Sequence, residues 1–222
     1  MGLLNLFNKK ADGQKLYERA QSFFEEGKIN EGYDFMEKAA EAGYPEAQFQ
    51  LACSIIEMKY NRPLDEGLMW MNKAAEQNHI FAINNLAMCY QMGNGVDVDY
   101  AKALSLLEKA ANLGDMMAYY NIGQAYVFGL GVKKDVLKGL SFIQKAAESE
   151  VEGCEHAQYF LGQVSESGMQ DEGISPDLNK AIKWYMKAAE HEDREAIKAL
   201  QRLKVIDGDF DDEEIAKRFM GM

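Results

Sequence analysis

The chain has 222 residues, of which 47% are hydrophobic, 27% are charged and only three are proline. With 36 acidic residues against 24 basic ones, its formal net charge is −12, which disfavours binding to nucleic acid or to an anionic membrane. No segment approaches the roughly 18 uninterrupted apolar residues of a membrane span. We therefore expect neither a nucleic-acid partner nor a membrane partner.

The N-terminal segment differs in order from a secretory signal. A short apolar patch comes first and is followed by Lys9 and Lys10, whereas a secretory signal begins with its basic residues. Gly2 suggests myristoylation, but Leu6 occupies the position where serine or threonine is needed. We assign residues 1–13 to an N-terminal tail or cap, and we expect a cytoplasmic protein.

The dominant feature of the chain is an internal repeat. A Lys-Ala-Ala triplet recurs at steps of 35, 36, 36 and 42 residues, beginning at Lys38, Lys73, Lys109, Lys145 and Lys187. Self-similarity at a period of about 20–50 residues indicates stacked supersecondary units. The repeat region is expected to cover residues 14–204. Its copies lie near 14–43, 44–78, 79–114, 115–153 and 154–192, with a partial copy at 193–204.

Each repeat is expected to form a pair of helices. In the fourth repeat, small and apolar residues occupy one face of a 3.6-residue helix: Val136, Gly139, Leu140, Ile143, Ala146 and Ala147. Asp99, Asp135 and Asp177 stand where second helices begin, and an aspartate there can accept hydrogen bonds from the free amides of the first turn.

Small residues on the first helices would let the two backbones of a pair approach closely, facing the Ala-Ala steps of the second helices. They are Ala52, Ala87, Gly123 and Gly162. Larger residues three positions before each triplet lysine would fill the space beside them. These are Phe35, Trp70, Leu106, Phe142 and Trp184.

Together these elements resemble the Sel1-like repeat, a longer relative of the tetratricopeptide repeat. The pattern is Ala-x-x-x-Leu-Gly, then Gly-x-Gly-Val, then Asp-x-x-Lys-Ala, then aromatic-x-x-Lys-Ala-Ala. Gly93 to Val96 and Gly129 to Val132 carry its glycine element. The resemblance covers roughly residues 14–200. The resemblance implies an all-α fold, namely a right-handed α/α superhelix of about five helix pairs. It also implies that the protein binds other proteins, and it suggests a bacterial source.

The copies differ mainly in their turns. The second repeat has Lys59 to Pro63 in place of the Gly-x-Gly element, and the fifth lengthens its turn to Gly168 through Ile174. Three further residues lie between Lys145 and Ala157, so insertions flank the first helix of repeat five on both sides. Insertions in repeat proteins map to loops that are often near a binding face, although drift in exposed turns would leave the same pattern.

Candidate catalytic and metal-binding residues are isolated. Cys53, Cys89 and Cys154 come from separate repeats and are odd in number, which favours a reducing compartment over a disulfide-linked scaffold. The three histidines, His79, His156 and His191, have no second histidine at helical ligand spacing, so surface or capping roles are expected and zinc is not. We predict no enzyme activity, no cofactor and no metal.

The C-terminal segment, residues 205–222, is the most acidic stretch of the chain. Asp207, Asp209 and Asp211 resemble the opening of a calcium loop, but Asp212 replaces its glycine and Arg218 replaces its terminal glutamate. A capping helical segment that ends the stack is the interpretation we prefer.

The predicted binding surface is a concave groove lined by the first helices. Two positions per repeat are expected to point into it, and they collect Tyr17, Gln21, Phe49, Cys53, Asn84, Met88, Tyr120, Gln124, Tyr159 and Gln163. Aromatic rings offer contact area and amides pair with backbone groups of either polarity, which suits an extended or helical peptide. The same rings could instead pack between repeats, because an aromatic at the first position belongs to the repeat pattern.

Three functions are therefore compared. The first is a non-enzymatic scaffold that holds a protein or peptide in the groove, and the negative charge favours a basic partner. The second is an immunity protein that neutralises a basic toxin or nuclease. The third is a regulatory subunit of an enzyme, which ranks last because no cluster of titratable residues converges in the sequence.

Overall fold

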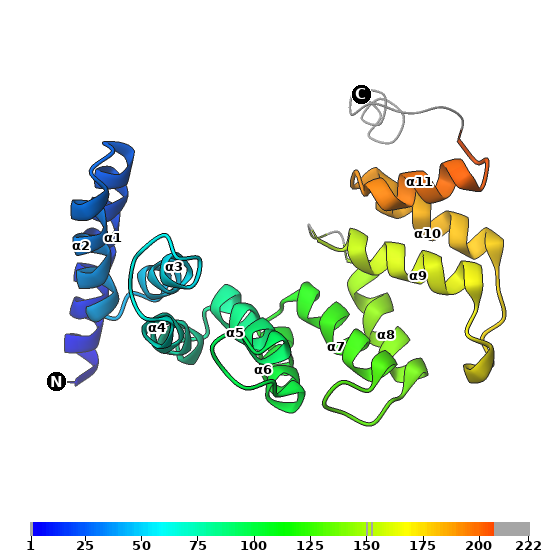
Figure 1. The fold of residues 1–222 in the computed structure, drawn as a ribbon, viewed down its shortest axis with the longest axis horizontal. Coiled ribbons are helices and arrows are strands. Elements are labelled where there is room, and N and C mark those ends of the chain that lie inside the picture. The colour runs from blue at the N-terminus through cyan, green and yellow to red at the C-terminus, as the bar shows by residue number, and fades with distance from the viewer. Residues whose placement is uncertain (1, 150, 152, 207–222) are drawn as a thin grey trace. The chain divides into compact units, whose positions relative to one another are not determined.

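The computed structural model describes residues 2–149, 151 and 153–206. This part of the chain is all-α, as predicted, apart from one isolated antiparallel bridge between Met169 and Ile174 (Figure 1). Of the acidic segment 205–222 that is expected to form a C-terminal cap, residues 207–222 lie outside the described residues.

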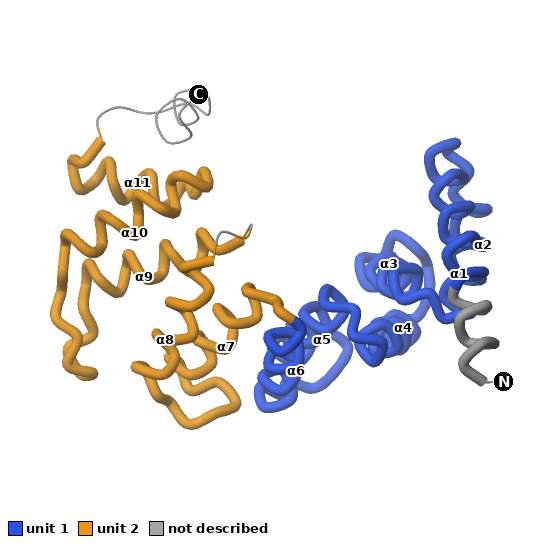
Figure 2. Tube along the Cα trace, turned by 180° about the vertical axis from the view of Figure 1, so that it is seen from behind, with its two compact units in different colours: residues 1–113 blue, residues 114–222 orange. Residues whose placement is uncertain are grey.

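The helices divide into two units, residues 1–113 and residues 114–222 (Figure 2). In unit 1, three helix pairs follow one another, and the second helices of the first two pairs pack on the first helix of the pair that follows. Their bounds are α1 Gly2–Glu25, α2 Ile29–Glu41, α3 Pro45–Ile56, α4 Leu64–Glu76, α5 Ile80–Met92 and α6 Tyr100–Asn112.

Unit 2 repeats this arrangement with two helix pairs and a final helix that packs on α10. A short 3-10 helix, η1 Gln170–Glu172, lies in the long turn of repeat five. The helices are α7 Met116–Phe128, α8 Val136–Ala147, α9 Glu155–Ser167, α10 Leu178–Glu190 and α11 Arg194–Arg202.

The predicted aspartate caps of the second helices are confirmed. Asp99 accepts a hydrogen bond from the backbone amide of Lys102 at 2.9 Å, and Asp135 and Asp177 accept equivalent bonds at 3.0 Å at the starts of α8 and α10. Each bond satisfies one amide that the helix itself leaves unpaired. These caps fix where each second helix begins.

The close approach of paired helices is also confirmed, although the facing residues differ from the prediction. A Cβ at Gly123 would lie 2.7 Å from the carbonyl oxygen of Gly139 and 2.4 Å from Ile143, and a Cβ at Gly162 would lie 2.4 Å from the ring of Tyr185. These neighbours lie earlier on the second helices than the Ala-Ala step. A larger residue at Gly123 would collide with the backbone of the second helix at Gly139, and one at Gly162 would collide with the ring of Tyr185. The first helix therefore needs a small residue at these contacts.

The lysine of the repeated triplet lies over an aromatic ring in most copies. The Lys73 ammonium lies 4.0 Å from the ring centre of Trp70, and Lys38 and Lys187 lie similarly over Phe35 and Trp184. In the third repeat, Leu106 replaces the aromatic, and Lys109 donates instead to the carbonyl oxygen of Ala75 in the preceding repeat at 2.6 Å. The triplet lysine therefore stabilises the end of its helix, either by contact with an aromatic ring or by a hydrogen bond to a carbonyl oxygen.

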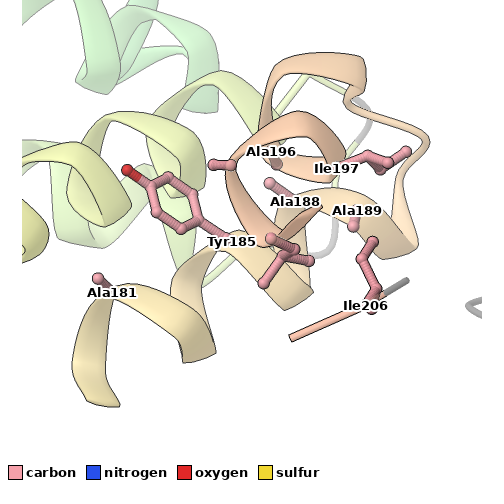
Figure 3. Close-up of a cluster of buried hydrophobic side chains, with 9 residues drawn as sticks. Ala181, Tyr185, Ala188, Ala189, Ala196, Ile197 and Ile206 are labelled. Atoms are coloured by element: carbon pink, nitrogen blue, oxygen red, sulfur yellow. The ribbon is translucent and has the colours of Figure 1, made fainter. Parts of the chain in front are cut away.

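Buried alanines and a few large side chains form the cores. At the end of unit 2, Tyr185 is 1% exposed and packs among small residues of α10 and α11, with Ile206 closing the cluster (Figure 3). Its hydroxyl donates to Glu166 at 2.8 Å, and both oxygens of that carboxylate also accept from Arg202. This network joins α9, α10 and α11.

Candidate protein-binding surfaces

The ten residues predicted to line a groove all lie on the first helices of their pairs, and none of them is fully buried. Met88 and Gln163 are exposed, and the other eight are half-buried. Unit 1 carries the first six of these residues, on α1, α3 and α5, and unit 2 carries the last four, on α7 and α9. A single groove through all five repeats stays a prediction.

In unit 1, the structure joins Tyr17 and Gln21 through a residue that the sequence did not single out. Gln50 donates from Nε2 to the hydroxyl oxygen of Tyr17 at 2.7 Å and to Glu46 at 2.8 Å, while its own oxygen accepts from Gln21 at 2.9 Å. The network links the first helix of repeat one to that of repeat two. Burial and the nearby Glu46 carboxylate raise the pKa of Tyr17, so its hydroxyl stays protonated.

The ring of Phe49 packs between repeats. This agrees with the second of the two roles considered for the first-helix aromatic residues, which were ligand contact and packing. It stacks on the imidazole of His79, with ring centres 4.7 Å apart, and lies 6.1 Å from the ring of Phe81. His79 also caps α5 by accepting from the amide of Ala82 at 3.2 Å, which confirms its predicted capping role. The outer edge of this cluster is Phe81, whose side chain is 66% exposed.

Helix α5 presents a stripe of large apolar side chains to solvent. Phe81, Met88 and Met92 follow one another at intervals of seven and four residues, which places them on one side of the helix. Met88 is 42% exposed and Met92 is 64% exposed. Only Met88 was predicted. Phe81 and Met92 lie seven residues before and four residues after Met88. This helical spacing in the sequence is the signal from which their shared face could have been predicted.

In unit 2, the aromatic-and-amide pairs are formed within single helices. Gln124 donates from its amide nitrogen to the hydroxyl oxygen of Tyr120 at 2.8 Å on α7, and Gln163 donates to Tyr159 at 3.1 Å on α9. Burial raises the pKa of both tyrosines. Since each amide uses only one of its two N–H groups in these bonds, it keeps hydrogen-bonding capacity for a ligand.

Two further aromatic residues extend this surface. Phe160 lies edge-on to Tyr120, with ring centres 6.3 Å apart, and edge-on to Phe128 at the same distance. Phe128, the last residue of α7, is 57% exposed. Tyr159 packs against Tyr185 of its own repeat at 5.7 Å. Among the aromatic rings of the first helices, Tyr159 therefore contributes to packing and Phe128 contributes to the accessible surface.

The thiols are protonated and unsuited to nucleophilic chemistry. Burial, with a smaller contribution from Glu57, raises the pKa of Cys53 to about 11, and burial also raises the pKa of Cys89 and Cys154. All three are free cysteines. A thiol is reactive mainly as the thiolate, so these side chains act as small apolar groups.

Among residues 2–149, 151 and 153–206, no three histidine, cysteine or acidic side chains gather as a metal site would require. Within the same residues, no helix combines the length and apolarity needed to cross a membrane.

Solved structures with the same fold come from bacteria. A Sel1 repeat protein from Oxalobacter formigenes is 31% identical, with a TM-score of 0.74, and the match covers 94% of this chain and 86% of that one. Two immunity proteins from Pseudomonas aeruginosa are 19% and 20% identical, each with a TM-score of 0.56. Those matches cover 94% and 95% of this chain, and 79% and 80% of theirs, and they show the fold alone. No curated protein matches the chain.

The family model of the Sel1 repeat matches this chain five times, at residues 13–44, 45–79, 80–115, 117–150 and 155–193. The five matches fall on the five helix pairs that the structure shows, from α1–α2 to α9–α10. The chain therefore belongs to the Sel1 repeat family, whose fold is typical of protein–protein interaction scaffolds.

Proposed function

We propose that this Sel1 repeat protein is a non-enzymatic bacterial scaffold that binds a basic protein or peptide on the exposed faces of its first helices. The observation that carries the proposal is the stripe of Phe81, Met88 and Met92 on α5. Three large apolar side chains on one side of one helix, each more than 40% exposed, gain nothing for folding by lying in water. Contiguous exposed apolar surface of this kind is typical of interaction sites.

The composition of the first-helix faces supports a protein partner. Methionine side chains adapt to apolar groups of different shape, and the flanking aromatic edges of Phe49 and Phe81 add rigid contact area. In unit 2, Tyr120 and Gln124 with the neighbouring Phe128 offer the same combination of ring and amide. A peptide laid against either face would meet apolar anchors and side-chain amides that pair with its backbone.

The charge of the chain supports a basic partner. A net charge of −12 attracts basic segments at long range and speeds their association, and the attraction falls as salt is added. The three free thiols support a reducing compartment, and we propose the cytoplasm.

An immunity function is the second candidate, and the acidic charge is the observation that favours it. An acidic repeat protein can cover the basic surface of a toxin or nuclease, and the name "immunity protein" is carried by two solved structures of this fold. A single basic partner held with nanomolar affinity would favour this function. Weak binding to many short peptides would favour the scaffold, and a captured enzyme whose turnover changes on binding would favour the third candidate, a regulatory subunit.

The proposal is tested by exchanging the apolar stripe for polar residues. A partner is first captured from bacterial cells that express the protein, and its affinity is measured by calorimetry. The double variant Phe81→Ser and Met92→Ser is expected to bind at least about tenfold more weakly, since each buried side chain of this size contributes about 1.5–3 kcal/mol.

The matched control exchanges an apolar side chain that is equally accessible but lies on a second helix. Leu137 of α8 is 64% exposed and is replaced by serine. We expect the Leu137→Ser variant to bind like the wild type. An equal loss of affinity in the double variant and in Leu137→Ser would contradict binding on the first helices. Unchanged affinity in the double variant would also contradict it.

A further inference from the structure

A pocket in unit 1 lies at the C-terminal ends of the first helices α3 and α5, where two turns meet. Its volume is about 570 Å³, and it forms between the segment 57–63 that follows α3 and the turn that follows α5. Ile56, Met58, Leu64 and the ring of Tyr60 supply apolar lining. This volume lies within the roughly 300–1,000 Å³ range of pockets that hold small ligands, so it accommodates a large side chain with its neighbouring backbone.

One wall of the pocket is the segment that replaces the Gly-x-Gly element in repeat two. The Tyr60 ring stacks on Tyr33 of α2, with ring centres 4.1 Å apart and planes 9° from parallel. Its hydroxyl donates to Glu37 at 2.8 Å, and the Arg62 guanidinium donates to the same carboxylate. The segment is therefore tied to the preceding repeat, so a ligand would meet a wall that is already ordered.

The opposite wall is the turn from Gly93 to Gly95. Both glycines have positive φ, 75° and 71°, where other residues are strained. A Cβ on Gly95 would lie 2.7 Å from Leu68 and 2.8 Å from Leu64, so the turn packs directly on α4. Its position is fixed by that contact, and the pocket exists between two ordered turns.

Met58 stands in the turn that ends α3 and lines the pocket. Its φ is 57°, and its side chain is 89% exposed. A left-handed backbone favours glycine or asparagine, and an exposed methionine gains nothing from the hydrophobic effect. The Met58 amide donates to the carbonyl oxygen of Ile55 at 3.0 Å, in the same way as Asn78, Glu192 and Lys204 donate at the ends of other helices, and those three residues are polar. What folding leaves unexplained is the apolar side chain, and an exposed methionine beside an apolar pocket adds adaptable contact area for a ligand.

Arg62 lines the pocket, and two acidic residues lie close in sequence to other lining residues. Asp65 follows the lining residue Leu64, and Asp97 comes two residues after Gly95. Both are exposed, and within the described part of the chain neither carboxylate forms a salt bridge. The cations nearby are already paired, since Arg62 contacts Glu37 and Lys59 contacts Glu57. An incoming cation would therefore meet basic side chains that are already neutralised, and two exposed carboxylates within two residues of the lining are open to it.

We propose that this pocket binds a basic peptide segment through one large apolar side chain. The apolar side chain enters between Met58, Leu64 and the glycine turn, while lysine or arginine residues on either side of it pair with Asp65 and Asp97. The site does not depend on the first-helix faces, because none of their aromatic or amide residues lines it.

The test uses three synthetic peptides and the methyl signals of the methionines. The peptides are acetyl-Lys-Lys-Trp-Lys-Lys-amide, the same sequence with alanine for tryptophan, and acetyl-Glu-Glu-Trp-Glu-Glu-amide. Full-length protein carrying ¹³C-methyl methionine is titrated with each, and the Met58 signal is assigned by its loss in Met58→Ala. We expect the Met58 signal to shift saturably with the basic tryptophan peptide. The alanine peptide should bind about 10- to 100-fold more weakly.

Matched variants separate the pocket from general attraction. Asp65→Asn with Asp97→Asn should weaken the basic peptide severalfold, and Met186, which is 42% exposed in unit 2, should show no saturable shift. The proposal is overturned if Met58 does not respond, if Met186 responds equally, or if the acidic peptide binds as well as the basic one. Because Met88 and Met92 report separately on α5, failure here leaves the first-helix proposal standing.

Discussion

The side-chain amide of Gln48 donates a hydrogen bond to the carbonyl oxygen of Ala40 at 3.0 Å, and its oxygen accepts from Gln77 at 2.8 Å. Gln48 is only 4% exposed, and it bonds a carbonyl near the end of the preceding repeat. Gln158 makes the same contact with Ala147 at 3.0 Å in unit 2. A buried glutamine at the start of a first helix thus joins its repeat to the last turn of the helix before it.

Replacing Gln48 by leucine should destabilise the protein by about 1–3 kcal/mol. The change keeps the volume of the side chain but removes two buried hydrogen bonds, each worth about 0.5–1.5 kcal/mol. Urea unfolding followed by circular dichroism measures the change. Gln163→Leu is the control, because Gln163 is exposed and its amide bonds Tyr159 within the same helix; equal effects of the two changes would contradict the structural role of Gln48.

Gly123→Ala should destabilise the protein by about 1–3 kcal/mol through overpacking. Alanine forms helices better than glycine by about 1 kcal/mol, so propensity alone predicts the opposite sign. The sign reverses because the new methyl group would lie 2.7 Å from the Gly139 carbonyl oxygen, which is backbone and cannot rotate away. Thermal unfolding checks this, and a raised melting temperature would show that α7 and α8 can separate at no cost.

Glu166 should make stability depend on pH in the acid range. Hydrogen bonds from Arg202, and a further one from Tyr185, lower the pKa of this carboxyl below its ordinary value of 4.5. The stabilisation is therefore fully present above about pH 4.5 and is lost as the pH falls through the lower folded-state pKa. Arg202 is exposed, so we expect an effect of at most about 1 kcal/mol.

The measurement compares wild type with Glu166→Gln by thermal unfolding between about pH 6 and about pH 3. The variant should be less stable at the upper end and should lose less stability across the range. Parallel pH profiles would show that the ion pair contributes nothing to folding.

Much of the architecture could be predicted because it depends on local chemistry repeated in every copy. Each second-helix cap is a hydrogen bond to an amide three residues further along, as at Asp99, Asp135 and Asp177. Gly123 is small because the backbone of the second helix passes close to it at Gly139. Both signals lie within one repeat. The helix pairs and their order followed from the same periodicity.

The surface could be predicted only in part, because exposure depends on packing between repeats. Phe49 and Phe81 occupy different helical positions, yet they meet across neighbouring repeats and leave Phe81 at the outer edge. The segment after α3 differs in sequence from the other turns, but stacking of Tyr60 on Tyr33 joins residues 27 positions apart in different repeats. Neither contact has a periodic signal.

The two aromatic-and-amide pairs of unit 2 give a binding prediction of their own. Replacing Tyr120 and Gln124 together by alanine should weaken a captured partner by about tenfold or more, since a buried aromatic side chain contributes about 1.5–3 kcal/mol. Helicity should stay unchanged by circular dichroism. Unchanged affinity, with binding abolished by shortening the repeat-five turn at 168–174, would move the site to that turn.

Hydrogen exchange of the complex with its captured partner tests the central claim most directly. Amides covered by a bound segment exchange more slowly, so each helix reports whether it lies under the partner. We expect added protection on the first helices α3, α5, α7 and α9, and unchanged exchange on the second helices α6, α8 and α10. Protection confined to the second helices would contradict it.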